Sequence, residues 1–318
     1  MEEFLQKLNK IVSKIEAWFS RKLSFIVLPG FDGMPLYDVL VFFFRGLFKG
    51  VLTYRASAIA FDFFLALVPF ILFLFTLIPF VTTADIQTLL LDMMDDVIPG
   101  SIYELAESTI VEIVSRPESG LLSIVFLMAI YFSTNGVDTI LMGFGQSYHE
   151  IEIWPWWKQK IRAFVLMLSL SFLIFISMTL LGFGKLTIKI LSEQQIITGQ
   201  LTIVALTFVQ WVIIIGNVLL SISLLYYFGQ PKDTERSRYR FISAGSLLST
   251  ILFIVGGSLL KLYFENFSRY NLLYGSIGSL IILLIWLYYN SIILLIGFEL
   301  NTSIRQSKLE KTRYRVIE

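Results

Sequence analysis

Apolar residues fill long stretches of this chain, and polar residues gather between them. A helix needs about 20 apolar residues to cross the hydrocarbon core of a membrane. Six stretches reach that length, and the second and fifth are the most interrupted by small or polar residues. The pattern predicts an all-α integral membrane protein with six transmembrane helices, at about 57–82, 121–145, 163–184, 201–228, 241–264 and 274–298.

Three further segments are expected to be helical without spanning. Residues 3–19 place apolar side chains opposite lysine and glutamate, which predicts an amphipathic helix on the anionic inner membrane surface or packed on the bundle. A shorter apolar element over 39–48 is expected at the interface. Residues 83–120 hold eight acidic residues and predict an outer helical hairpin, broken at Pro99-Gly100. This hairpin is either merely solvated or involved in gating or partner binding.

Composition agrees with a membrane protein. Hydrophobic residues make up 56% of the chain and charged residues 15%, with a mean hydropathy of +0.75. Soluble domains carry about 25% charged residues. There is no cysteine, which excludes disulfides and thiolate metal sites. The N-terminus lacks a basic region followed by an apolar core, so no cleavable signal peptide is expected.

The distribution of basic residues predicts the orientation. With both termini in the cytoplasm, 20 of the 25 Lys and Arg residues fall in inner segments, as the positive-inside rule requires. The cluster from Trp154 to Lys160 is interpreted as an interfacial anchor before the third span. The predicted organisation is an interfacial region (1–55), a membrane domain (56–303) and a basic cytoplasmic tail (304–318).

Polar side chains in the predicted spans gather in the cytoplasmic half. At 1.5 Å per residue, Asp62 and Asp138 lie about 9 and 10 Å from the inner ends of their spans. Because such groups usually face the bundle interior or water, they predict a polar cavity walled by spans 1, 2, 5 and 6, with span 4 nearby. The substrate-path candidates are Arg55, Asp62, Asn135, Asp138, Asn217, Ser246, Ser249 and Asn290. Alternatively, the Asn and Ser residues only bond helices together.

The sixth stretch carries a motif. It begins with Tyr274-Gly275-Ser276, continues through Trp286-Leu287-Tyr288 and closes with Gly297-Phe298-Glu299-Leu300-Asn301. This resembles the signature of the YihY/BrkB family of bacterial inner-membrane proteins, once labelled ribonuclease BN. The first span is similar to that of the family at Arg55, Ala56 and Leu67 to Pro69.

The resemblance covers residues 40–303 and implies a six-helix membrane fold in the bacterial inner membrane. It also implies links to virulence, envelope integrity and transport. At Asp62 the family pattern has an aromatic or small polar residue, so a role for this carboxylate does not follow from the family.

The residues do not favour ribonuclease chemistry. A metal-dependent nuclease needs a cluster of His and carboxylate ligands, and the chain has one histidine, His149. No basic groove with interleaved aromatic residues is present in the sequence either. We therefore expect no enzymatic activity, and no metal, cofactor or nucleic-acid partner.

Three functions fit these observations. The first is a transporter or flippase for a lipid-like or amphipathic envelope component, with membrane lipids as partners. The second is proton- or cation-coupled transport of a small solute, and the third is a non-transporting envelope scaffold. A homo-oligomer is compatible with each. A cavity open sideways to lipid favours the first, a closed ion site the second, and a filled bundle the third.

Overall fold

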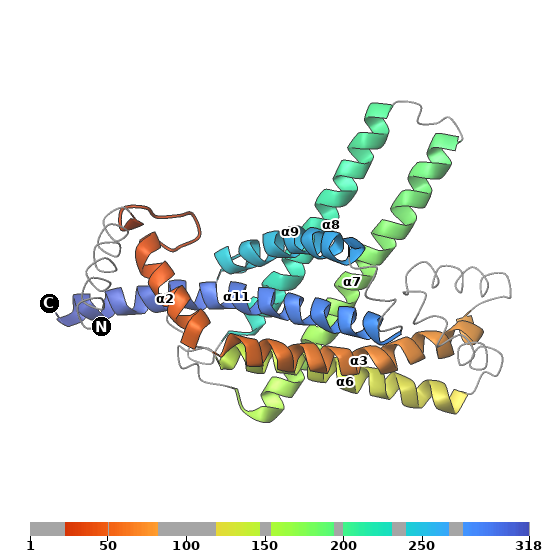
Figure 1. The fold of residues 1–318 in the computed structure, drawn as a ribbon, viewed down its shortest axis with the longest axis horizontal. Coiled ribbons are helices and arrows are strands. Elements are labelled where there is room, and N and C mark those ends of the chain that lie inside the picture. The colour runs from red at the N-terminus through yellow and green to blue at the C-terminus, as the bar shows by residue number, and fades with distance from the viewer. Residues whose placement is uncertain are drawn as a thin grey trace.

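A computed structural model describes residues 23–49, 51–81, 119–146, 154–193, 200–230, 240–266 and 276–317. Within these ranges the regular structure is helical throughout (Figure 1). The helices are α2 (Leu36–Lys49), α3 (Leu52–Val81), α6 (Ser119–Gly145), α7 (Trp156–Glu193), α8 (Gln200–Phe228), α9 (Ala244–Asn266) and α11 (Ser276–Ile317). The amphipathic helix predicted over 3–19 and nearly all of the acidic hairpin predicted over 83–120 lie outside the described residues.

The described helices make this an all-α membrane protein. Five of them are long and apolar enough to cross a membrane: Leu52–Phe73, Leu122–Gly145, Trp156–Ser177, Val204–Phe228 and Leu280–Glu310. The predicted fifth span corresponds to α9, whose apolar part, Ala244–Leu260, is shorter. The shorter apolar element expected over 39–48 lies within the helix α2, and its place at the membrane interface stays a prediction.

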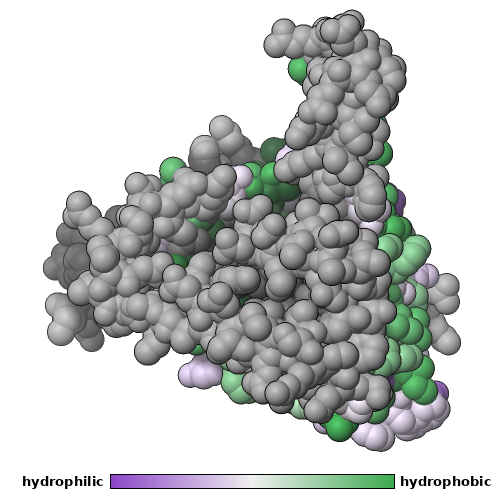
Figure 2. All heavy atoms as spheres, turned by 90° about the vertical axis from the view of Figure 1, so that its right-hand side faces the viewer, coloured by the Kyte–Doolittle hydropathy of each residue, from purple (hydrophilic) through white to green (hydrophobic). Residues whose placement is uncertain are grey.

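Large apolar side chains cover the outside of these helices. Phe61 on α3, Phe172 on α7 and Trp211 on α8 are all more than half exposed. Where described residues are visible in Figure 2, hydrophobic side chains dominate one flank of the molecule. This surface suits contact with lipid chains, because a soluble protein rarely exposes so much contiguous apolar area.

The helices pack against one another in distinct pairs. Helices α3 and α6 pack side by side in opposite directions, and α11 lies along α3 with α9 and α2 against it (Figure 1). Helices α7 and α8 contact each other and rise steeply away from the rest. Between α6, α8 and α11 the core is aromatic, with the Phe144 and Phe298 rings stacked at 4.0 Å and Tyr226 edge-on to both.

Helices α9 and α11 approach until their backbones touch. A side chain on Gly245 would overlap the carbonyl oxygen of Gly297, and one on Gly297 would overlap the hydroxyl of Ser249. Small residues permit such close packing in membranes, where van der Waals contact and hydrogen bonds hold helices together. The Tyr226 hydroxyl adds α8 to this unit by bonding Ser249 Oγ at 2.6 Å and donating to the Leu294 carbonyl at 2.8 Å.

Candidate functional site

A pocket of about 680 Å³ lies where α3, α6 and α7 meet. Its volume is in the range of about 300–1,000 Å³ that is typical of small-molecule sites. The lining combines polar and apolar side chains, as an amphipathic ligand requires. The lining residues are Asp62, Leu127, Ile130, Tyr131, Thr134, Asn135, Asp138, Thr139, Met142, Trp156 and Lys160.

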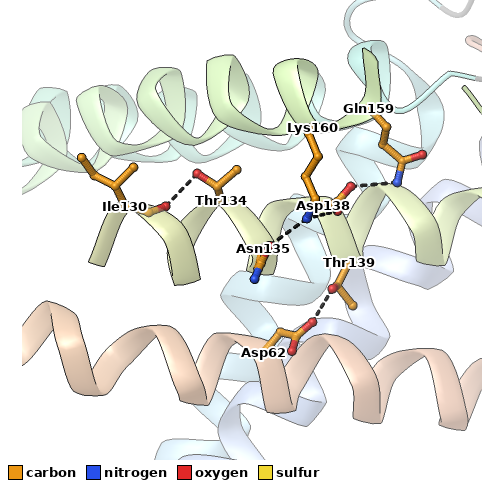
Figure 3. A network of polar contacts seen from close by, with 8 residues as sticks. All are labelled: Asp62, Ile130, Thr134, Asn135, Asp138, Thr139, Gln159 and Lys160. Carbon is orange, nitrogen blue, oxygen red and sulfur yellow. Dashed lines mark hydrogen bonds and ion pairs between the residues drawn. The ribbon is translucent and has the colours of Figure 1, made fainter. Parts of the chain in front are cut away.

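Among the described residues, Lys160 is the only basic one that lines this pocket. It lies one turn into α7 and points toward α6 (Figure 3), where its Nζ is 2.6 Å from Asp138 Oδ2. The same ammonium group donates to Asn135 Oδ1 at 2.7 Å. An ammonium group has three N–H donors, so these two contacts leave one for a ligand. Its side chain is one-third exposed, which keeps the charge within reach from the pocket.

Asp138 holds α6 and α7 together. Its side chain is 6% exposed, and its Oδ1 accepts a hydrogen bond of 2.8 Å from Gln159 Nε2 while Oδ2 faces Lys160. A buried carboxylate is costly unless it is paired and hydrogen-bonded, and Asp138 meets both conditions. Its role in the pocket is therefore to position Lys160.

Asp62 faces the pocket from α3, opposite Lys160 (Figure 3). Its Oδ2 accepts a short hydrogen bond from the Thr139 hydroxyl on α6. The half-buried carboxylate contributes a second, opposite charge to the lining. The pocket thus combines a cation and an accessible anion on different helices, with the Lys160–Asp138 pair close to neutral.

The pocket opens on the apolar surface. Leu127 and Tyr131 on α6 and Trp156 at the start of α7 all line it, and each is more than 60% exposed. These side chains belong to helices that are long and apolar enough to span. Exposed apolar and aromatic side chains of these candidate spans therefore border the mouth of the pocket.

The structure brings together only some of the predicted substrate-path residues. Asp62, Asn135 and Asp138 line one pocket. Its third wall is α7, the third span, whereas the sequence predicted walls from spans 5 and 6. Lys160 was missed because the tryptophan and lysine cluster around it was interpreted as an interfacial anchor. The usable signal was its place one turn inside α7, although the sequence does not show that this helix faces Asn135 and Asp138.

Arg55 lies elsewhere, in a buried contact between four helices. Its Nη1 donates to the Gly143 carbonyl on α6 at 3.0 Å, and its Nη2 is 3.7 Å from Glu299 Oε2 on α11. Helix α2 packs against the same carboxylate at Gly46, because glycine has no side chain that would overlap Glu299. Arg55 therefore does not line the pocket.

Four more candidates make contacts between or within helices instead of lining the pocket. Asn217 on α8 donates to the Leu173 carbonyl of α7 at 2.6 Å. Ser246 bonds Ser243 at the start of α9, and Ser249 joins Tyr226 as described above. Asn290 donates to the carbonyl of Trp286, one turn back in its own helix.

The contacts of α11 explain the closing motif of the last span. Gly297 permits the close approach of α9, and Glu299 is fully buried beside Arg55. Asn301 binds the start of α9, accepting from the Gly245 N–H and donating to Ser243 Oγ, both at 2.8 Å. Trp286 and Tyr288 lie on the same helix at its more exposed end, while Tyr274 and Gly275 lie outside the described residues.

Comparison with known proteins agrees with this motif. The family model described as virulence factor BrkB matches residues 43–316, which is most of the chain. The chain belongs to the BrkB family. The family model thus covers the helices that form the pocket and the buried Arg55–Glu299 pair.

Individual relatives carry two kinds of name. The putative ribonuclease-like protein YfkH of Bacillus subtilis is 26% identical over 80% of this chain and 90% of its own length. A UPF0761 membrane protein of Mannheimia succiniciproducens is 21% identical over 82% of this chain and 87% of its own. A UPF0761 membrane protein of Psychromonas ingrahamii is 35% identical, but over only 23% of this chain and 25% of its own. No solved structure matches the chain.

The part of the chain that the structure describes contains no group of three or more His, Cys, Asp or Glu residues placed to hold a metal ion. His149, the one histidine, lies outside it. The chemistry that the described pocket offers is ionic and hydrogen-bonding recognition, by Lys160 and Asp62, beside an apolar wall.

Proposed function

We propose that this BrkB-family protein moves a lipid-like or amphipathic envelope component across the bacterial inner membrane, through the pocket between α3, α6 and α7. The observation that carries the proposal is a charged pocket bordered by exposed apolar and aromatic side chains, among them Tyr131 and Trp156. A headgroup can enter such a pocket while its acyl chains stay in the bilayer. The proposal does not include ribonuclease activity.

We infer that the chain crosses the membrane six times with both termini in the cytoplasm, and that α9 is the fifth span. Asp62 lines the pocket from ten residues into α3, and Trp156 and Lys160 line it from the beginning of α7. In the orientation predicted by the basic residues, these positions lie on the cytoplasmic side. The pocket would then receive lipid from the inner leaflet.

The ligand class follows from the charges. Lys160 suits a phosphate oxygen, and Asp62 on the facing helix suits an ammonium group. Together they fit a zwitterionic headgroup such as phosphoethanolamine. The open mouth with its exposed apolar rim favours this function over an enclosed ion site, and the volume of the pocket favours it over a filled scaffold.

Lipid translocation in proteoliposomes tests the proposal. The full-length protein is reconstituted with fluorescent phosphatidylethanolamine, and a membrane-impermeant quencher reports movement between leaflets. We expect translocation above empty liposomes, and we expect Asp62→Asn to slow it about tenfold, the loss of about 1.4 kcal/mol of headgroup binding. Asn290→Ala is the matched control, because Asn290 bonds only its own helix among the described residues.

A double substitution removes the other charge without leaving Asp138 unpaired. In Lys160→Gln with Asp138→Asn, both members of the buried pair become neutral and can still hydrogen-bond. We expect the same slowing as for Asp62→Asn. Translocation that neither variant changes would move the lipid path away from this pocket, and no translocation by the wild type would refute the proposal for phospholipids.

A further inference from the structure

A second polar site lies away from the transport pocket, where the chain enters α2. It is a hollow of about 490 Å³ between the loop 28–33, Arg240 just before α9, and Lys308 near the end of α11. Three parts of the chain that are distant in sequence therefore meet there. None of these residues takes part in the proposed transport.

The loop has a fixed shape. Gly30, Asp32 and Gly33 adopt positive φ angles of 93°, 52° and 78°, which turn the backbone back on itself. On either side of the turn, Phe31 and Met34 are buried against Val39 of α2 and against Leu300 and Ile304 of α11. The anchored side chains hold Asp32 at the surface, beside the two basic residues.

The site carries two cations and one anion. Arg240 Nε is 3.2 Å from Asp32 Oδ1, and Lys308 Nζ is 3.6 Å from Asp32 Oδ2. Both basic side chains are well exposed, 67% for Arg240 and 43% for Lys308. The formal charge of the three groups is +1, so Asp32 brings the cations together without neutralising them.

Exposed apolar side chains flank these charges in two separate segments. Residues 25–28, Phe-Ile-Val-Leu, are all exposed, and Phe25 is 87% exposed. Phe241 and Ile242, next to Arg240, are exposed as well. Apolar side chains beside basic ones are the composition of surfaces that lie in the membrane interface, where the former enter the acyl region and the latter meet phosphates.

We propose that this face binds the phosphate of an anionic phospholipid. Arg240 and Lys308 hold the phosphate, and the segments 25–28 and 241–242 insert between neighbouring lipids. An anionic lipid fits better than a zwitterionic one, because Asp32 is already occupied by both cations and the net charge is positive. The site is separate from the transport pocket, and the proposal does not depend on transport.

Native mass spectrometry of the full-length protein measures this binding directly. The protein in detergent is titrated with phosphatidylglycerol, and phosphatidylcholine serves as the reference lipid. A basic residue near a lipid surface contributes about 1 kcal/mol, which corresponds to about fivefold in affinity. We therefore expect Arg240→Gln and Lys308→Gln each to weaken phosphatidylglycerol binding about fivefold and to leave phosphatidylcholine binding unchanged. Lys158→Gln, at the start of α7, is the matched control for loss of one exposed charge.

A third variant separates lipid binding from structural support. Asp32→Asn removes both ion pairs but raises the charge of the site to +2, and asparagine tolerates a positive φ angle. We expect it to tighten phosphatidylglycerol binding, whereas a purely structural Asp32 predicts weaker binding. Inorganic phosphate should not displace the lipid. Weaker binding by Asp32→Asn, displacement by phosphate, or no effect of Arg240→Gln with Lys308→Gln would each overturn the proposal.

Discussion

Replacement of Glu299 by glutamine tests the buried ion pair that joins four helices. The substitution keeps the size of the side chain, so the close contact with Gly46 is preserved and only the charge is lost. Arg55 then remains as a buried cation, with one hydrogen bond from Nη1 to the Gly143 carbonyl. Within the part of the chain that the structure describes, its Nε and Nη2 have no hydrogen-bond partner even with Glu299 present.

The expected cost follows from the geometry. The charged atoms are 3.7 Å apart, and the two side chains are 3% and 0% exposed. At this separation two unit charges attract by roughly 4 kcal/mol when the effective dielectric constant is 20. Removal of one partner of a buried pair commonly costs about 3–5 kcal/mol. We therefore expect Glu299→Gln to lower the free energy of unfolding by about 4 kcal/mol.

Equilibrium unfolding in mixed micelles of increasing sodium dodecyl sulfate content measures this change, with tryptophan fluorescence as the signal. A second variant, Arg55→Met with Glu299→Met, removes both charges, and we expect it to recover most of the loss, because an apolar pair carries no desolvation penalty. A loss below about 1 kcal/mol for Glu299→Gln, as in a solvent-exposed pair, would refute the reasoning and show that water reaches both groups.

Two further substitutions test the α8–α9–α11 unit in the same unfolding assay. Gly245→Ala should destabilise by about 1–3 kcal/mol through overpacking against the backbone of Gly297. Gly257→Ala, at a position with open space in the same helix, should be neutral or slightly stabilising. Equal effects of the two substitutions would contradict the close approach of α9 and α11. Tyr226→Phe should cost about 1–2 kcal/mol, because the buried Ser249 hydroxyl and a carbonyl lose a partner; no change would contradict the two hydrogen bonds.

Helical periodicity was sufficient to predict one wall of the pocket. Asn135 and Asp138 are three residues apart, so they lie on one face of α6, and the structure places that face toward the pocket. Asp62 could be assigned to the same depth from its position in the first span. The partner of Asp138 could not, because hydropathy gives the depth of each helix but not its neighbours, and α7 supplies Lys160.

The small polar residues of the predicted spans gave less information about which side chains line the pocket. Ser246 and Ser249 are fully buried, and their hydroxyls bond neighbouring groups in α9 and α8. Their spacing on one helical face is the same whether that face lines a cavity or packs on another helix. Arg55 posed a similar problem, since its position near the inner interface did not reveal that Glu299 lies opposite. Only tertiary packing determines which helices are neighbours, and it therefore distinguishes a residue that lines a cavity from one that packs on another helix.

The backbone contact between Gly245 and Gly297 differs in kind from the polar contacts that line the pocket. Separating α9 from α11 breaks contacts that no ligand can replace. Helix α7 contacts α6 in two ways: Lys160 and Gln159 bind Asp138, and Ala163 and Leu166 are buried in the apolar core. A phosphate and an amine can substitute for the polar contacts as they enter. Under the proposed function, a bound headgroup can therefore replace the polar contacts between α7 and α6 in the pocket, whereas it cannot replace the packing of α9 on α11.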